Sequence, residues 1–409
     1  MSRPLRLGFL VYEIDQRAGM QRQASQLLPR LRDLGLEVKV VTTAAPRDLP
    51  RLRGLPVPGA PDLPVARLAV TRRHVFEALA RTWLSSQGGV DVLLGLGWHE
   101  AVHAARISKR TGIPFVVRYA CSGAHGDLAA LAREPELREL LSAASRHVCI
   151  SEEILAEALA AGLPAERLVS IPNGVDLAAW RREVKPARLP WVSEGRDDLE
   201  VVLFVGRLAR QKRVDVLLEA AARLADRRPK FRLALAGQGP LRADLEAQAR
   251  SLGIAERVAF LGVREDVLAL HRAARVFVLP SEGEGMPNAL LEALAAGTPS
   301  VATEVPGTLE VARHEQEALL VPPEDPRALA AALERLLEDA DLGGELCARL
   351  RAGGWARAAE RYDVDQAAGR YAAALREAAQ DALPRRAGPP ERAGRLVKRL
   401  RNPSQPPPG

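Results

Sequence analysis

The sequence predicts an α/β protein with two Rossmann-like, doubly wound domains. Short apolar runs alternate with amphipathic helical segments along most of the chain, which is the pattern of parallel sheets with helical crossovers. At 409 residues the chain is also long for a single hydrophobic core. Glycine and proline stand between the periodic segments, where the loops at strand and helix ends are expected.

Composition and charge narrow the class of protein. Hydrophobic residues make up 47% and charged residues 27%, as in soluble globular proteins, and no long apolar run predicts a transmembrane helix or a secretory signal. The three cysteines, Cys121, Cys149 and Cys347, are widely spaced, so they indicate neither a disulfide framework nor a zinc cluster and favour a reducing, cytoplasmic compartment. The formal net charge of +7 favours phosphorylated substrates, anionic lipid or nucleic acid as partners, and its distribution decides among them.

The first half of the chain alternates strands with helices. It opens with strand 5–11, helix 21–34 ended by Gly35, and strand 37–42, a βαβ unit that predicts a parallel sheet. Residues 46–64 are rich in proline and lack periodicity, which predicts a surface connection. The further elements expected in this half are strands 65–70, 91–96, 113–118, 146–150 and 168–171, helices 75–84 and 137–144, and a helix start at 151–153.

Three loops of this half follow strands, at the edge where open α/β sheets bind ligands. The first loop contains Gly19, the second contains His99, and the third contains Ser122, Gly123 and His125. His99 is a candidate for substrate contact, and the alternative is a capping or packing residue at a helix start. For Gly19 and for the third loop, the alternative is a structural turn.

The second half begins with a nearly continuous apolar strand, 199–205, of the kind that is covered on both faces. Arg207 and Lys212 lie in the loop that follows, ahead of helix 214–224. A guanidinium grips phosphate oxygens as a fork and an ammonium acts as a point charge, so the pair predicts an anion site; the alternative is two surface cations. The other expected elements are strands 231–236, 258–261, 276–279, 300–303 and 318–321 and helices 241–252, 266–274, 326–337 and 345–361.

Residues 281–297 join a buried strand to a helix through a glycine loop. The helix start offers unpaired N–H groups and the positive end of the peptide dipole, and Gly283 and Gly285 allow close approach, so the site suits phosphate. The carboxylates Glu284 and Glu292 would repel phosphate, so they indicate hydroxyls that donate hydrogen bonds to them. Phosphates flanked by hydroxyls describe a nucleotide-sugar. The alternative is two solvated charges at a helix start.

The segment from Glu284 to Glu292 resembles the Glu-x7-Glu motif of the retaining, GT-B-fold glycosyltransferases of family 4. The likeness runs from about residue 171 to residue 323 and more loosely through the first half. It implies two Rossmann-like domains that face each other across a cleft. It also implies transfer of a sugar, with retention, from a nucleoside diphosphate donor to an acceptor hydroxyl.

The resemblance assigns roles to residues of both halves. Arg207 and Lys212 would bind the diphosphate, the backbone at Val263 and Arg264 the nucleobase, Glu284 the sugar hydroxyls and Glu292 the ribose. The expected catalytic residues are Glu284, Arg207, Lys212 and His125. The expected donor-binding residues are Gly19, Arg207, Lys212, Val263, Arg264, Glu284, Gly285, Met286, Pro287, Asn288, Ala289 and Glu292. The acceptor side is expected to carry His99, Ser122, Gly123 and His125.

The chain departs from the family pattern at two positions. Many relatives carry two glycines where this chain has Ala18 and Gly19, and a histidine where it has Ala120; His125 is the candidate to replace that histidine. No metal and no other cofactor is expected, because a GT-B enzyme needs no metal to hold its diphosphate. The Asp-x-Asp pattern at residues 363–365 is interpreted as helix-start acids.

The expected parts are a first, acceptor-side domain (1–174), an interdomain linker (175–198), a nucleotide-sugar-binding domain (199–364), a terminal helix that crosses back (365–382) and a basic, proline-rich tail (383–409). The tail holds seven basic residues and one acid, which suits contact with an anionic membrane from the cytoplasmic side; the alternative is a disordered tail. Little aromatic interleaving argues against nucleic acid.

The predicted function is thus a retaining glycosyltransferase, suited to cell-envelope glycan or glycolipid synthesis. A nucleotide-sugar-binding protein without transferase activity is the alternative that the two departures support. A dinucleotide-dependent oxidoreductase is disfavoured, because no complete Gly-x-Gly-x-x-Gly follows the first strand of either half. The base, the sugar and the acceptor stay open.

Overall fold

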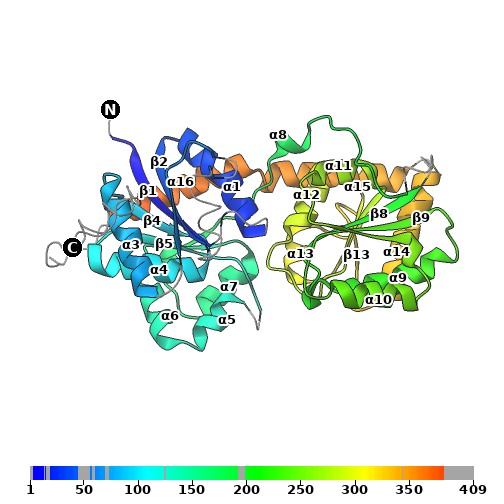
Figure 1. The fold of residues 1–409 in the computed structure, drawn as a ribbon, viewed down its shortest axis with the longest axis horizontal. Helices are drawn as coiled ribbons and strands as arrows, with labels where there is room; N and C mark the ends of the chain where they lie inside the picture. The colour runs from blue at the N-terminus through cyan, green and yellow to red at the C-terminus, as the bar shows by residue number, and fades with distance from the viewer. Residues whose placement is uncertain are drawn as a thin grey trace, which may run out of the picture. The chain divides into compact units, whose positions relative to one another are not determined.

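The computed structural model divides the chain into two compact units. Unit 1 comprises residues 1–171 and 365–409, and unit 2 comprises residues 172–364. Each unit is a parallel sheet with helices on both sides (Figure 1). The residues that the structure describes are 3–12, 14, 19–44, 56–57, 60–69, 73–123, 126–191, 199–342 and 344–381.

Unit 1 is built on a seven-stranded sheet with the order β3-β2-β1-β4-β5-β6-β7, in which all neighbours are parallel. Its strands are β1 (Leu5–Val11), β2 (Leu36–Ala44), β3 (Val65–Ala69), β4 (Val92–Gly95), β5 (Phe115–Tyr119), β6 (Arg146–Cys149) and β7 (Leu168–Ser170). Its helices include α1 (Gly19–Asp33), α3 (Arg73–Ser86), α4 (Trp98–Thr111), α5 (Asp127–Ala132), α6 (Pro135–Ser142) and α7 (Glu152–Ala160).

The two faces of this sheet are covered by different helices, as the alternation of side chains along β1 shows. Leu7, Phe9 and Val11 are buried in one core with residues of α1. Gly8 faces the opposite side, where an added Cβ would lie 2.7 Å from the Leu93 side chain and 3.5 Å from Leu84 of α3. Both faces of β1 are therefore packed, which explains its nearly continuous apolar sequence.

The last helix, α16 (Val364–Gln380), packs into the core of unit 1. Its apolar face places Ala368, Tyr371 and Leu375 against the core that contains β1 and α1. Two polar contacts reach α1 and the turn after it: Arg30 Nε lies 2.5 Å from Asp365 Oδ1, and Arg376 Nη2 donates to the Leu34 carbonyl at 2.7 Å. The end of the described chain is thus part of the first unit.

Unit 2 is built on a six-stranded parallel sheet with the order β10-β9-β8-β11-β12-β13. Its strands are β8 (Glu200–Val205), β9 (Phe231–Ala236), β10 (Val258–Gly262), β11 (Val276–Leu279), β12 (Ser300–Thr303) and β13 (Leu319–Val321). Its helices include α8 (Leu177–Trp180), α9 (Val214–Ala225), α10 (Arg242–Ser251), α11 (Val267–Ala273), α12 (Asn288–Ala296), α13 (Pro306–Val311), α14 (Pro326–Asp341) and α15 (Glu345–Arg361). Helix α9 packs against α14 on one side, and α12 packs against α15 on the other (Figure 1).

Two segments outside the main elements have buried side chains in their described parts. Residues 175–191, the described part of the expected linker, belong to unit 2, where α8 ends in the buried Trp180 and the Trp180 ring meets that of His271 edge-on at 5.6 Å. The expectation of a surface connection over residues 46–64 holds only in part for the described residues, since some of them are exposed and others are buried. Val57 and Leu63 are buried in the core of unit 1, because apolar side chains without helical or strand periodicity can still fill a core.

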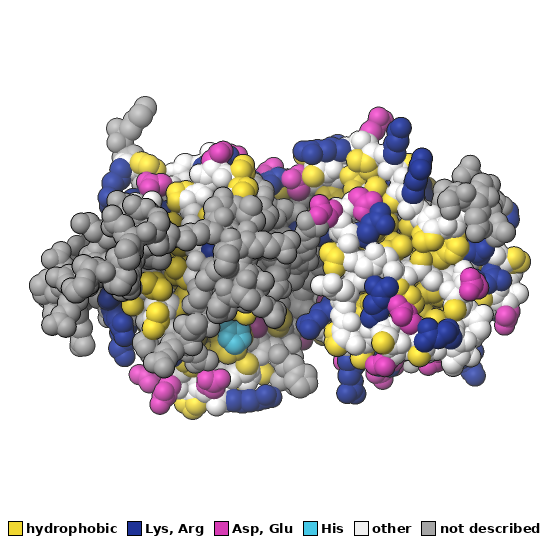
Figure 2. All heavy atoms as spheres, viewed as in Figure 1, with side chains coloured by type: hydrophobic (Ala, Val, Ile, Leu, Met, Phe, Trp, Pro, Cys, Tyr) yellow, Lys and Arg dark blue, Asp and Glu magenta, His cyan; other side chains and the backbone are white. Residues whose placement is uncertain are grey.

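The next observations concern the hydropathy of the described helices and the charged side chains on the surface. Among the described helices, none combines the length and the hydropathy that crossing a bilayer requires. On the face drawn in Figure 2, basic and acidic side chains are interspersed over the described part of the molecule rather than gathered by sign.

Candidate active site

The sheet of unit 2 has a switch point between β8 and β11. From β8 the chain continues to β9 on one side, and β11, which follows later in the chain, pairs with the other side of β8. Loops that leave neighbouring strands in opposite directions open a crevice at the carboxyl ends of those strands. The loop after β8 carries Arg207 and Lys212, and the loop after β11 carries Glu284.

The loop that carries Arg207 is held by the loop after β9. Leu208 N donates to the Gln238 carbonyl at 3.0 Å, and Gly206 N donates to the Ala236 carbonyl at 3.0 Å. A Cβ on Gly237, whose φ is +145°, would lie 1.8 Å from the Gly206 carbonyl oxygen. The glycines after β9 therefore serve the close crossing of two backbones, which explains a Gly-x-Gly pattern without a nucleotide-binding role.

The two cations of the site are engaged differently. The Arg207 side chain is exposed, and the described residues supply neither a hydrogen bond nor an ion pair to its guanidinium. The Lys212 ammonium contacts Oε1 of Glu284. An ammonium has three donors, so Lys212 can hold Glu284 and still offer two hydrogen bonds to another anion.

Glu284 is fixed from several sides although it lies in a loop. Its residue is 9% exposed, and Oε1 also accepts a 2.6 Å hydrogen bond from Ser281 Oγ. The Ser281 carbonyl in turn accepts from Thr303 Oγ1 of β12 at 2.5 Å. A Cβ on Gly307, in the first turn of α13, would lie 2.3 Å from the Glu284 carbonyl oxygen. Oε1 of the carboxylate thus has a defined position, and the described residues supply no hydrogen bond to Oε2.

Gln211 joins the two loops, a role that the sequence did not indicate. Its Nε2 donates to the Gly283 carbonyl at 2.7 Å, and its carbonyl accepts from Glu282 N at 3.0 Å. The two loops are consequently tied at the point where their charged side chains meet. A glutamine between two cations carries no motif, so only the pairing in space reveals it.

Helix α12 begins beside these loops. Pro287 occupies its N-cap position and no side chain of the described residues caps the helix. The Met286 sulfur lies 3.1 Å from Asn173 N, and Asn288 Oδ1 accepts from Asn173 Nδ2 at 2.9 Å. Leu290 N donates to the carbonyl of the N-cap residue Pro287 at 3.0 Å, and the N–H groups that precede Leu290 in the helix are too early for an intrahelical acceptor, which suits the bound anion that the sequence predicted there.

Glu292 of the predicted donor site is more deeply buried than Glu284, and Val263 and Arg264 lie farther along the edge of the sheet. Glu292 lies in the second turn of α12 and is 4% exposed. Val263 follows β10, two strands from β8, and is 44% exposed. Arg264 Nε donates to Asp266 at 2.7 Å, and this hydrogen bond raises the pKa of Arg264 and lowers that of Asp266. The Arg264 side chain is thereby occupied locally.

The residues predicted for the other domain lie at the carboxyl edge of the unit 1 sheet. Gly19 opens α1, and His99 is the second residue of α4, where its ring stacks on Trp98 with centroids 3.6 Å apart. Gly123 has a φ of +80° and donates its N–H to Glu157 Oε1 at 2.7 Å, and Ser122 precedes it. His125 lies outside the described residues.

Asp127 is a further residue of this edge, in the same loop as Ser122 and Gly123. It is 8% exposed, and its Oδ2 accepts hydrogen bonds from Ala120 N at 2.6 Å and Cys121 N at 3.2 Å, which closes the loop after β5. Burial raises the pKa of Asp127, against the opposing effect of these hydrogen bonds.

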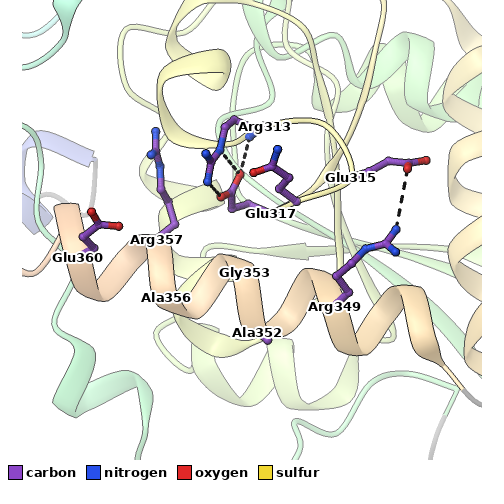
Figure 3. Close-up of a pocket in the computed structure, with 10 residues that line it drawn as sticks. Arg313, Glu315, Glu317, Arg349, Ala352, Gly353, Ala356, Arg357 and Glu360 are labelled. Carbon is purple, nitrogen blue, oxygen red and sulfur yellow. Dashed lines mark hydrogen bonds and ion pairs between the residues drawn. The ribbon is translucent and has the colours of Figure 1, made fainter.

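A hollow of about 410 Å³ elsewhere in unit 2 lies between residues 313–317 and α15 (Figure 3). Four of its charged groups form two pairs: Arg313 with Glu317 at 2.5 Å, and Arg349 with Glu315 at 3.9 Å. The lining carries as many acidic as basic side chains, three of each. Among the described residues, no group of three or more metal-ligating side chains is placed to hold a metal ion.

Both units match families of known proteins. Residues 18–174 match the model of the family described as glycosyl transferase 4-like domain, and residues 200–339 match that described as glycosyl transferases group 1. The D-inositol 3-phosphate glycosyltransferase of Thermobispora bispora is 30% identical over 406 residues, covering 88% of this chain and 90% of that protein. The 2-deoxystreptamine glucosyltransferase of Streptomyces kanamyceticus is 31% identical over 359 residues, covering 84% and 89%.

A solved structure confirms the fold. Anabaena Alr3699/HepE, in complex with UDP-glucose, superposes with a TM-score of 0.74 at 22% identity, covering 91% of this chain and 99% of that one. The expectation of two Rossmann-like α/β domains is thus confirmed. Some other relatives are matched over less than half of their own length.

Proposed function

Because the chain belongs to the group 1 glycosyltransferases of GT-B fold, as its family matches and full-length relatives show, we propose that its donor is a nucleoside diphosphate sugar bound by unit 2. One observation carries the proposal: the Lys212 ammonium contacts the buried Glu284 carboxylate where β8 and β11 end, and the exposed Arg207, to which no described residue is paired, lies in the same loop as Lys212. Cations suit a diphosphate and a carboxylate oxygen suits a sugar hydroxyl.

The proposed mechanism rests on stabilising the departing diphosphate. Negative charge develops on the leaving oxygen, and Arg207, Lys212 and the start of α12 would face it without rearrangement. Two side-chain cations supply the charge that a divalent metal would otherwise supply, so we propose transfer without a metal. Addition of a chelator should then leave the rate unchanged.

Glu284 and Glu292 would bind the two ends of the donor. Glu284 Oε2 would accept from a sugar hydroxyl, while Oε1 stays with Lys212 and Ser281. Glu292, deeper in α12, would serve the ribose, and the backbone at Val263 and Arg264 the base. We further propose retention of the anomeric configuration, which family membership supports and product NMR tests.

The acceptor would enter over unit 1, at the loops that carry His99, Ser122, Gly123 and His125, of which His125 lies outside the described residues. A cell-envelope glycan or glycolipid is the proposed product, made at the cytoplasmic side of a membrane. The support is the basic sequence of residues 383–409, which lie outside the described residues. The two relatives are named for different acceptors, D-inositol 3-phosphate and 2-deoxystreptamine, so their similarity to this chain does not identify its acceptor.

A binding protein of the same fold without transferase activity is the second candidate. The observation that favours it is Ala120 at the end of β5, where many relatives carry histidine. Slow hydrolysis of a bound nucleotide-sugar, seen as release of free sugar, would decide for the enzyme.

The test is nucleotide binding by the full chain, measured as a thermal shift with UDP, GDP, ADP and TDP and their common sugars, with UDP-glucose first. Arg207→Ala should weaken the effective affinity by about tenfold or more, because a bidentate charged contact is lost. Arg223→Ala is the matched control, since Arg223 is an exposed arginine on α9. If no nucleotide shifts the protein, or if both variants respond alike, the proposed donor site is wrong.

A further inference from the structure

The unit 1 sheet has its own switch point, between β1 and β4. The chain runs from β1 to β2 on one side, and β4 pairs with the other side of β1. Helices α1 and α4 begin on the two sides of the resulting crevice. Gln21 is the third residue of α1, and Glu100 is the third residue of α4. Both residues therefore lie in the first turn of a helix that begins at this crevice.

The backbone of Tyr12, just past β1, ties these two side chains together. Gln21 Nε2 donates to the Tyr12 carbonyl at 2.8 Å. The backbone N–H groups of Tyr12 and Gly97 hydrogen-bond the Glu100 carboxylate. Because an amide nitrogen must face the Tyr12 carbonyl, the orientation of the Gln21 amide is defined, and its oxygen points away.

Each side chain is left with one acceptor that receives no hydrogen bond from the residues that the structure describes. These acceptors are Gln21 Oε1 and Glu100 Oε2, both buried, in residues that are 8% and 7% exposed. Gly97 makes room for the carboxylate, because a Cβ there would lie 2.6 Å from Glu100 Oε2 and 3.0 Å from the Met20 side chain. Buried acceptors without donors are uncommon in folded proteins, so a ligand that brings donors is the expected partner.

The charges around the crevice decide which ligand fits. Burial raises the pKa of Glu100, and the nearby Asp127 carboxylate acts in the same direction. Arg118 is the buried cation of this edge, and it is occupied: its Nη1 donates to the Leu96 carbonyl at 3.1 Å and it hydrogen-bonds Tyr371. A phosphate would meet acceptor oxygens of like charge, whereas a hydroxyl or an ammonium would satisfy them.

We propose that Tyr12, Gln21 and Glu100 form the acceptor subsite, and that this subsite selects a hydrogen-bond donor group, hydroxyl or protonated amine, over phosphate. The Tyr12 side chain is 48% exposed beside the crevice and offers an aromatic face to a sugar or cyclitol ring. The inference rests on the proposed function, since it names the acceptor class of that reaction.

The test compares three cyclitols of similar size: 2-deoxystreptamine, which carries amines, myo-inositol, which is neutral, and D-inositol 3-phosphate. Binding to the full chain is measured by isothermal titration calorimetry in the presence of saturating UDP. The amine and the neutral cyclitol should bind, and the phosphate should bind at least tenfold more weakly. Glu100→Gln should weaken 2-deoxystreptamine about tenfold, because an amide replaces a charged acceptor.

Two further variants complete the experiment. Glu136→Gln removes one exposed carboxylate from α6 of the same unit and should bind like the wild type. Gln21→Met keeps the volume but removes the second acceptor, so it tests the subsite if Glu100→Gln fails to fold, which circular dichroism shows. Both Glu100→Gln and Gln21→Met should weaken binding.

The inference is overturned if D-inositol 3-phosphate binds as tightly as the other two, if the folded variants bind like the wild type, or if none of the three cyclitols binds a protein that still binds UDP. Nucleotide binding reports on the proposed donor site, whose charged residues all lie in unit 2. A protein that binds no nucleotide therefore contradicts the proposed function, whereas loss of cyclitol selectivity contradicts only the acceptor class.

Discussion

At the scale of single residues, Glu284 illustrates how one carboxylate can serve two purposes. Its Oε1 accepts from Lys212 and Ser281, which fixes the side chain, and its Oε2 stays available. In the proposed complex Lys212 would bind both the carboxylate and the diphosphate. The affinity for the nucleotide and the affinity for the sugar are therefore linked through this ion pair.

Glu284→Gln should separate the two affinities. A neutral amide no longer competes for Lys212, so UDP should bind as tightly as to the wild type or more tightly. The donor sugar loses a charged acceptor, so the transfer rate should fall by about tenfold or more. Calorimetry with UDP and a transfer assay measure the two effects. Glu282→Gln, an exposed neighbour, is the control; a parallel loss of UDP affinity would contradict the linkage.

The three thiols should differ in reactivity. Burial raises the pKa of the Cys149 and Cys347 thiols to about 12, whereas Cys121 is exposed and none of the three is in a disulfide. Because the thiolate is the reactive form, an aromatic disulfide reagent at pH 8 should modify one thiol in the native protein and three in urea. Cys121→Ser should abolish the native reaction. A second fast thiol in the native chain would show that a buried site opens.

Glu100 should make stability depend on pH. Burial raises its pKa in the folded protein, so this residue favours folding at pH below its unfolded pKa, and the contribution is lost as pH rises through the folded pKa. Asp127 acts in the same direction and the N–H groups of Gly97 and Tyr12 oppose it. Urea unfolding of Glu100→Gln and wild type should therefore show a stability difference in favour of the variant that is larger at pH 8 than at pH 5. An equal difference at both pH values would count against a buried, titrating carboxylate.

At the scale of elements, the chain passes out of unit 1 near residue 171 and returns near residue 365. The two passages lie side by side within unit 2: Val175 N donates to the Tyr362 carbonyl at 2.7 Å, and Val364 N donates to the Val175 carbonyl at 3.2 Å. A Cβ on Gly174 would lie 2.4 Å from the Val364 Cα. Glycine at this position allows the close approach.

Gly174→Ala should lower the free energy of unfolding by about 1–3 kcal/mol, because the added methyl group overlaps backbone that cannot yield easily. Gly369→Ala is the matched control. Gly369 lies inside α16 and has nothing within 4 Å of an added Cβ, so alanine there should stabilise by about 0.5–1 kcal/mol. Urea denaturation of both variants measures the contrast. If Gly174→Ala is neutral, the two passages are not packed as described.

At the scale of the whole molecule, the distribution of charge separates two kinds of binding. The charged residues of the candidate active site are few and lie at one sheet edge, whereas seven basic residues and one acid lie in residues 383–409, outside the described residues. Each cation near an anionic membrane adds about 1 kcal/mol, and salt screens the attraction. The sequence of the tail therefore predicts membrane affinity that does not depend on the nucleotide.

A chain that stops after Ala382 retains every described element and should lose binding to vesicles that contain about 30% phosphatidylserine. The full chain should co-sediment with these vesicles at low salt and be released by about 0.5 M salt, because the attraction is electrostatic. Neutral phosphatidylcholine vesicles are the control. UDP binding should be the same in both chains. Equal co-sedimentation of the two chains would place membrane contact elsewhere or exclude it.

The sequence by itself determined the class of fold and the edge at which the charged residues gather. The spacing of apolar residues along the chain identifies strands and helices locally. In a parallel sheet, every loop that follows a strand lies at the same edge of that sheet. Arg207, Lys212 and Glu284 could be assigned to one edge for this reason before their contacts were known. The resemblance to a family supplied the rest of the expected donor site.

Only the tertiary structure decided which side chains meet. Lys212 pairs with Glu284, and Gln211 binds the loop that carries Glu284, although these residues are far apart in the sequence. In unit 1, Gln21 and Glu100 are also distant in the sequence, and each has a buried acceptor without a partner among the described residues. Such contacts depend on strand order and on the close crossing of loops, which leave no periodic signal in a single sequence. Gly237 is another example of what a sequence pattern leaves open. The Gly-x-Gly pattern at residues 237–239 suggests contact with a ligand, but in the structure Gly237 allows the close approach of its backbone to that of Gly206.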